Sequence, residues 1–252
     1  MNVIFDWFNQ IKGRKQIDIN KLPSQGIFYN TDFKLWIKKV NIQDVLEYES
    51  LYTNDITIVL SLIKKIVQRY TTLPKNYLFD DIKSVDIIFI FLEIVRWTTN
   101  KSLTVEYYND ITGAVEIIEF TPENFHYFMI PQTSFSTESK EFVIDGYRFS
   151  IPSIGIETSV TQFLIEKSYA TDADRYNHYE YNFMYFLGNK KRLTFNEIDN
   201  LIEIFNNDLS IEEKDKINNI ISKFRGFAKY TLKDGNRLID INNRIDLSKV
   251  FN

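Results

Sequence analysis

The longest apolar run of the chain, VDIIFIFLEIVRW at residues 85–97, restricts the fold more than any other stretch. As a helix this run would extend for about 20 Å, and it contains Asp86, Glu93 and Arg96, so it is too short and too charged to cross a bilayer. Its β-branched and aromatic residues would also suit a strand, but its length favours a helix, with Ser84 as the N-cap. We therefore expect a helix that is buried inside a globular domain.

Arg96 lies on this almost entirely apolar run, three residues after Glu93. That spacing places both side chains on one face of a helix, and a buried guanidinium without a partner is costly. We therefore expect Arg96 to form an ion pair or to contact carbonyl groups near the hairpin that follows, and we assign it no catalytic role.

The remaining composition is that of a globular protein, and it excludes several kinds of site and partner. The chain has 252 residues, among them 21 Phe, 15 Tyr and 3 Trp. A domain of this size buries about 70–75% of its unfolded surface.

The 34 acidic and 30 basic residues are mixed along the sequence, so no broad basic face results, which argues against nucleic acid as the main partner. Cysteine is absent, which excludes disulfides, thiolate nucleophiles and cysteine-ligated zinc. Asp6 interrupts the first apolar stretch, and we expect neither a secretory signal nor stable membrane insertion.

Hydrophobic periodicity predicts a mixed α and β organisation in the first half of the chain. Residues 33–40 alternate as expected for a strand with one face on the core. Asn41 is a candidate cap for a short helix, and a 3.6-residue apolar stripe over residues 56–67 predicts a longer helix. Residues 103–120 alternate on both sides of a turn rich in Asn, Asp and Gly, which predicts a β-hairpin.

A second hairpin is predicted by FVIDGYRF at residues 142–149. Its Asp-Gly pair suits a two-residue type I′ turn. Such a turn would set Ile144 opposite Tyr147 and Phe142 opposite Phe149 on one apolar face.

Beyond Pro152 the sequence is mainly helical. Helices are predicted at residues 158–170 and 172–187. Two more helices are predicted after the capping boxes Thr194 with Glu197 and Ser210 with Glu213. A small hairpin is predicted around residues 234–235. We place a boundary near residues 130–140, where PQTSFSTESK is polar and lacks periodicity. The predicted fold class is α+β: an N-terminal amphipathic helix within residues 1–20, a mixed domain with hairpins and buried helices at 21–135, and a hairpin plus mainly helical domain at 136–252.

The first helix is the candidate partner-binding element. Ile4, Trp7, Phe8 and Ile11 recur at the spacing of one helix face, and the helix is expected to end near Gly13. This face either packs on its own domain or lies in a groove of a partner, as bulky apolar faces of terminal helices do. Binding to a membrane surface is less favoured, because one short helix with three nearby cations supplies little attraction to lipid.

The sequence contains no recognisable catalytic motif. His126 and His178 are the only histidines and belong to no metal or catalytic pattern, and the nucleophile-elbow, P-loop and dinucleotide signatures are absent. Asp80, Asp81 and Asp86 precede the apolar helix, where carboxylates favour the positive end of its macrodipole. The alternative is a metal or acid–base role for them, as in a carboxylate-based hydrolase. We predict no enzyme, no cofactor and no metal.

The segment KLPSQGIFYN at residues 21–30 concentrates chain-bending residues in a sequence that has 8 Gly and 5 Pro in all. Pro23 restricts its own φ and keeps Leu22 out of helical geometry, while Gly26 permits a left-handed backbone. This combination predicts a structural corner ahead of the first predicted strand, not a catalytic loop.

The order of segments resembles a known family. The residues that match its Leu-Pro-Ser-x-Gly-x-x-Tyr opening are Leu22, Pro23, Ser24, Gly26 and Tyr29. The strand, the two helices, the apolar run with its Arg96 and the first hairpin then follow in the family's order. That family is the baseplate hub assembly protein family of T-even type contractile-tailed bacteriophages, and the resemblance covers roughly residues 21–120.

The resemblance implies a non-enzymatic role in virion morphogenesis, in the assembly of a contractile virus tail. The protein would act in the host cytoplasm during assembly and would either leave the tail baseplate, as a chaperone does, or remain in the virion as a hub component. Its implied partners are baseplate hub or tape-measure proteins, bound through protein–protein interactions. A different virion accessory or adaptor protein is the alternative within the same class.

Overall fold

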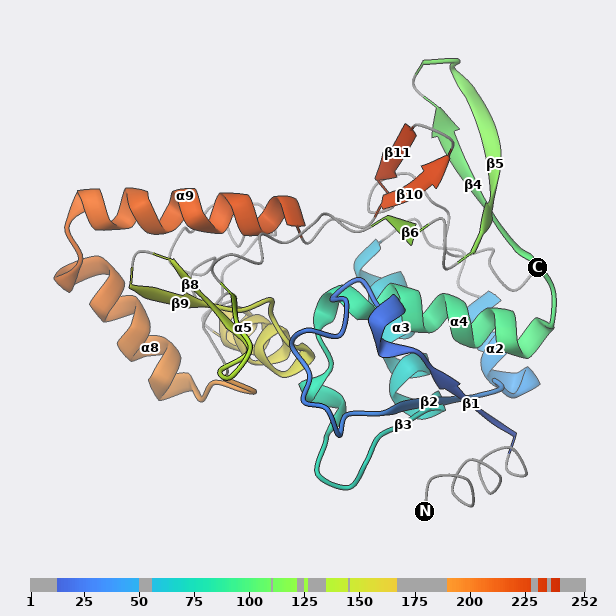
Figure 1. The fold of residues 1–252 in the computed structure, drawn as a ribbon, viewed down its shortest axis with the longest axis horizontal. Coiled ribbons are helices and arrows are strands. Elements are labelled where there is room, and N and C mark those ends of the chain that lie inside the picture. Colours follow the sequence, from blue (N-terminus) through green and yellow to red (C-terminus); the bar gives the residue numbers. More distant parts are fainter. Residues whose placement is uncertain are drawn as a thin grey trace.

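The computed structural model describes residues 13–49, 56–109, 111–121, 125–126, 135–144, 146–166, 190–227, 231–234 and 237–240. In this part of the chain helices combine with small antiparallel sheets, which confirms the predicted α+β class (Figure 1). The predicted partner-binding helix with Ile4, Trp7, Phe8 and Ile11 lies outside the described residues, and so does the predicted helix at 172–187.

Helix α4, Ile87–Thr99, is the apolar run and belongs to the largest hydrophobic core. Its first nine residues, Ile87 to Val95, are all buried, Glu93 included. The N-cap position is held by Asp86 and not by Ser84 as predicted, because Ser84 begins a 3-10 turn and its hydroxyl donates to the Pro152 carbonyl at 3.1 Å. Among the described helices none, α4 included, is long and apolar enough to span a membrane.

A three-stranded antiparallel sheet packs against α4. Its order is β1 (Arg14–Ile17), β2 (Leu35–Lys38) and β3 (Thr71–Thr72). β2 is the predicted strand, and Leu35 and Ile37 on its core face are fully buried. The sequence does not predict β1, since its residues RKQI are mostly polar. Its strand conformation depends on pairing with β2, which sets Ile17 opposite Leu35.

Two helices follow β2 as predicted, α2 (Ile42–Glu49) and α3 (Ile56–Tyr70). The predicted cap of α2 is formed, because Asn41 Oδ1 accepts a hydrogen bond from the Asp44 backbone N–H at 2.8 Å. α3 packs against α4 and buries Ile63 and Val67 in the same core. The apolar stripe of α3 therefore provides one of the layers that the buried helix α4 requires.

The predicted hairpin at residues 103–120 consists of β4 (Leu103–Asn109) and β5 (Ala114–Phe120) and projects from the body of the molecule (Figure 1). One of its faces buries Leu103, Tyr107 and Ile118 in the core that contains α4. Because side chains alternate along a strand, its other face points away from that core.

A second core lies against the sheet of β7 (Phe135–Ser136), β8 (Glu141–Ile144) and β9 (Tyr147–Phe149). The predicted pairs of Ile144 with Tyr147 and of Phe142 with Phe149 are confirmed. Phe28, from the N-terminal half, packs in this core too, with its ring centroid 5.8 Å from that of Phe142. The two halves of the chain therefore share a core.

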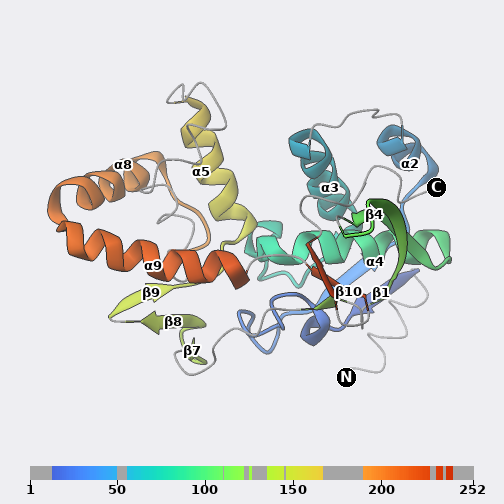
Figure 2. The ribbon, with the colours of Figure 1, turned by 90° about the horizontal axis from the view of Figure 1, so that it is seen from above.

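The second half also contains α5 (Ile154–Glu166), α8 (Phe195–Glu203), a π-helical turn η5 (Ile204–Asp208) and α9 (Ile211–Phe227). Figure 2 shows α5, α8 and α9 grouped on the side away from α2 and α3. α5 begins earlier than predicted, because the Ser153 hydroxyl caps it by accepting from the Ile156 N–H at 3.3 Å. Both predicted capping boxes are formed, with the hydroxyls of Thr194 and Ser210 each accepting an N–H three residues later at 3.3 Å.

The predicted terminal hairpin consists of β10 (Thr231–Asp234) and β11 (Arg237–Asp240). β10 also pairs with β6 (Phe125–His126), a strand that lies earlier in the chain, shortly after β5. This sheet, like the second core, joins residues from both sides of the predicted boundary near residues 130–140.

Candidate functional site

The motif at residues 22–29 forms the predicted corner through consecutive turns. Gln25 N donates to the Leu22 carbonyl at 2.7 Å, and Tyr29 N donates to the Gly26 carbonyl at 3.1 Å. Gly26 has a φ of 71°, and a Cβ atom at this position would lie 3.0 Å from the Ile19 carbonyl oxygen. Both the backbone angle and the close approach therefore require glycine here.

Asp86, at the start of α4, holds this corner in place. Its carboxylate accepts from the Ser24 N–H at 2.8 Å, from the Ser24 hydroxyl at 2.7 Å and from the Tyr29 hydroxyl at 2.6 Å. Burial raises the pKa of Asp86 to about 6, although these hydrogen bonds and the charge of Lys83 oppose the rise. Asp86 makes no capping hydrogen bond to α4. Its side chain therefore closes the corner and does not cap the helix, which the dipole interpretation of the sequence missed.

Lys83 extends the same network into the second half of the chain. Its ammonium group donates to the Ser150 hydroxyl at 3.1 Å and to the Ile151 carbonyl at 3.0 Å, and it lies 5.3 Å from the centre of the Phe28 ring. Its backbone N–H donates to the Tyr29 hydroxyl at 2.9 Å. Burial lowers the pKa of Lys83 to about 8 despite nearby carboxylates. The network thus joins three segments that are distant in sequence.

Asp80 and Asp81, the other two carboxylates of the hydrolase alternative, form ion pairs that do not involve Asp86. Asp80 pairs with Arg192, and Asp81 Oδ1 lies 3.0 Å from the ammonium nitrogen of Lys191. These ion pairs attach the segment before α8 to the turn η2 (Phe79–Asp81). The described residues contain no group of three or more His, Cys, Asp or Glu that could hold a metal ion, and the side chains of both histidines lie outside the described part.

Arg96 forms the predicted ion pair with Glu93, at 2.9 Å between Nη2 and Oε1. A second cation, which the sequence does not predict, reaches the same carboxylate: Lys15 Nζ, from β1, lies 2.9 Å from Glu93 Oε2. Glu93 is buried, so the two cations stabilise a charge that would otherwise be costly inside the core.

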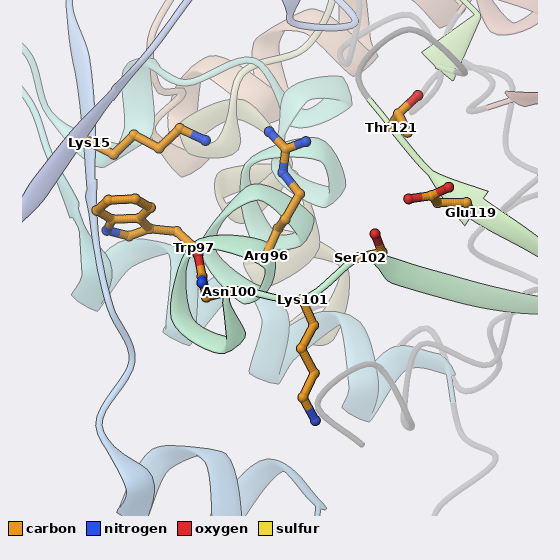
Figure 3. A pocket seen from close by; sticks show the side chains of 8 residues that line it. All are labelled: Lys15, Arg96, Trp97, Asn100, Lys101, Ser102, Glu119 and Thr121. Carbon is orange, nitrogen blue, oxygen red and sulfur yellow. The ribbon is translucent and has the colours of Figure 1, made fainter.

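A pocket of about 320 Å³ lies next to this ion cluster, at the base of the hairpin (Figure 3). It is lined by Lys15, Arg96, Trp97, Asn100, Lys101, Ser102, Glu119 and Thr121. Three of these eight residues are cations and one is a carboxylate. Figure 3 shows the Arg96 guanidinium between Lys15 on one side and Glu119 with Thr121 on the other, while the Lys101 ammonium group points away from them. We call this recess the cationic pocket.

The outer face of the hairpin carries an apolar surface, which we call the hairpin patch. Its members and their exposed fractions are Tyr108 (51%), Ile111 (80%), Val115 (64%) and Ile117 (66%). In the hairpin register Tyr108 lies opposite Val115, and Ile117 lies two residues further along the same face of β5. Large apolar side chains grouped on an exposed element are typical of a surface that a partner covers.

Comparison with known proteins returns no relative, since no family model, no curated protein and no solved structure matches this chain.

The sequence contains a signal for the hairpin patch, although the patch is not among the predicted binding surfaces. In β5, AVEIIEF, Val115 and Ile117 alternate with Glu116 and Ile118, so both faces of the strand carry large apolar residues. A two-stranded hairpin packs one face on its own core, as Ile118 does here. Apolar residues on the second face therefore indicate a contact outside the domain.

Proposed function

We propose that this chain is a non-enzymatic morphogenesis protein of a contractile-tailed phage, an assembly factor or structural component of the baseplate hub that acts through protein–protein contacts. The observation that carries the proposal is the hairpin patch, in which large apolar side chains are exposed on an element that projects from the body of the molecule. Burial of such a patch by a partner would be favourable, because it removes apolar area from water.

The arrangement of the resembling segments supports the phage assignment. The opening motif and the start of the apolar run contact each other through the hydrogen bonds of Ser24 and Tyr29 to Asp86. The hairpin with the patch follows directly after the apolar run. The segments that carry the resemblance thus form one structural unit in this chain.

The proposed partners are baseplate hub or tape-measure proteins, met in the host cytoplasm while the tail is assembled. A permanent component would remain in the baseplate of the mature virion, whereas an assembly factor would leave it. Mass spectrometry of purified virions distinguishes these two cases.

Affinity capture from infected cells tests the proposal. Tagged wild type is compared with a Val115→Thr, Ile117→Thr double variant, because threonine keeps the preference for a strand and removes apolar surface. We expect hub or tape-measure proteins to co-purify with wild type and their recovery to fall about tenfold in the double variant. Val143→Thr, on the exposed face of β8, is the matched control and should behave as wild type.

Two other outcomes contradict parts of the proposal. Capture of virion proteins that do not belong to the hub or the tape measure would favour a different accessory or adaptor protein. Equal recovery of hub proteins by wild type and the double variant would remove the hairpin patch from the interface.

A further inference from the structure

We propose that the cationic pocket receives a carboxylate group of the partner, while an apolar segment of the same partner covers the hairpin patch. The inference rests on the interaction role proposed above, but it does not require the partner to be a tail protein. It specifies the partner's chemistry: an extended segment with apolar residues followed by an acidic residue or a free C-terminal carboxylate.

The pocket and the patch lie along one face of β5. Val115, Ile117 and Glu119 alternate along the strand, and Glu119 forms part of the pocket wall together with Thr121. From Ile117 to Thr121 an extended chain advances about 13 Å. A partner segment of roughly four residues that runs along β5 can therefore contact both features.

The cations of the pocket are not fully neutralised. Lys15 and Arg96 share the single charge of Glu93, and among the described residues Arg96 Nε and Nη1 form no hydrogen bond. Lys101 also lines the pocket, but Figure 3 shows its ammonium group directed away from the other lining side chains, so Lys15 and Arg96 supply the charge inside it. The carbonyl end of α4 attracts these cations but does not occupy the remaining guanidinium donors. A carboxylate would, because arginine binds carboxylates through paired N–H groups.

A carboxylate on a protein segment fits this site better than a small inorganic anion does. The apolar patch beside the pocket has no counterpart in a small inorganic ion. We therefore assign the site to a protein segment.

Glu106 gives the bound segment a direction. It lies opposite Ile117 in the register of the hairpin, beside the patch, and its side chain has no partner among the described residues. An acidic residue of the partner placed over the patch would meet this carboxylate and be repelled. The same residue placed at Arg96 would be attracted, so the acid belongs at the pocket end of the segment.

Selection from a random dodecapeptide library on the immobilised, purified full chain tests this inference. We expect the enriched peptides to carry an apolar block followed by Asp, Glu or the free C-terminus. Fluorescence polarisation then compares the best peptide with its amide version, in which Asn or Gln replaces the acid and the C-terminus is amidated. We expect binding to weaken about tenfold, as for loss of a charge-assisted hydrogen bond.

Variants of the protein locate the binding. Arg96→Gln and Lys15→Gln should each weaken binding of the acidic peptide and leave binding of its amide version unchanged, while Val143→Thr should bind both as wild type does. Lys15 lies on strand β1 and its side chain is 31% exposed, so its variant keeps the test valid if Arg96→Gln disturbs the fold. Enrichment of neutral or basic peptides, failure to enrich any peptide, or equal binding by wild type and the Lys15 variant would overturn the inference.

The outcome is distinguishable from that of the proposed function. Acidic peptides that bind as expected, with no tail protein captured from infected cells, would refute the phage assignment and keep the inference. Hub proteins captured through the hairpin patch, with no preference for acidic peptides, would refute the inference and keep the function.

Discussion

Tyr29→Phe removes a single hydroxyl group that joins two segments of the buried network. This hydroxyl donates to Asp86 Oδ2 at 2.6 Å and accepts from the Lys83 backbone N–H at 2.9 Å. The ring remains, so its stacking on Phe33, with 4.0 Å between the centroids, should be retained. The substitution therefore tests the hydrogen bonds of the corner and little else.

The expected loss has two parts. The buried N–H of Lys83 is left without its acceptor, which costs about 1–3 kcal/mol. Asp86 loses one of its hydrogen-bond donors, and a hydrogen bond to an ionised group contributes about 1.5–3 kcal/mol. Because both effects occur in one network, they do not add fully, and we expect the free energy of unfolding to fall by about 2–4 kcal/mol.

Urea unfolding at pH 7.5, followed by circular dichroism, measures this loss as a lower midpoint. In thermal unfolding the same loss lowers the melting temperature by about 2–4 °C per kcal/mol for a chain of this size. Tyr147→Phe is the matched control, because the Tyr147 hydroxyl forms no hydrogen bond with the described residues. A loss below about 0.5 kcal/mol, within the usual range of surface substitutions, would show that the network does not stabilise the corner.

Three further predictions concern the same architecture. Because burial raises the pKa of Asp86 from 3.8 to about 6, its contribution to stability is fully present below pH 3.8 and is lost as the pH rises through 6. Between pH 4.5 and 7.5 wild type should therefore lose roughly 2 kcal/mol more unfolding free energy than Asp86→Asn, and parallel pH profiles would contradict this. Gly26→Ala should lower the free energy of unfolding by at least about 1–2 kcal/mol in urea titrations. The loss should exceed that of Gly13→Ala, because Gly13 also has a positive φ but has nothing within 4 Å of an added Cβ. Ser153→Ala removes the cap of α5 and the hydrogen bond from the Ser153 hydroxyl to the Lys191 carbonyl, and should lower the thermal midpoint by an amount that corresponds to at least about 1 kcal/mol; an unchanged midpoint would show that neither contact stabilises the fold.

The features that the sequence predicts well are those set by residues a few positions apart. The capping boxes at Thr194 and Ser210 need only a hydroxyl and a Glu three residues later. The pairing of Ile144 with Tyr147 follows from a two-residue turn between alternating strands. The ion pair of Arg96 is predicted by its spacing from Glu93 on one helix.

The features that the sequence does not predict depend on partners far along the chain. Nothing local makes residues 14–17 a strand, because that conformation requires the neighbouring edge of β2. Lys83 is a residue type that is almost never buried, and its burial is possible because Ser150 and Ile151 supply acceptors from the second half. Asp86 follows the same rule, since its hydrogen-bond donors lie about sixty residues earlier in the chain.

The residues of the opening motif and the residues that carry the proposed interaction form two separate sets. Leu22, Ser24 and Tyr29 are buried. Ser24 and Tyr29 form hydrogen bonds with Asp86, and Leu22 packs in the surrounding core. Val115 and Ile117 are exposed and make no comparable contribution to that core. Substitution on the hairpin can therefore change the proposed interaction while the corner, whose contacts lie elsewhere, is kept.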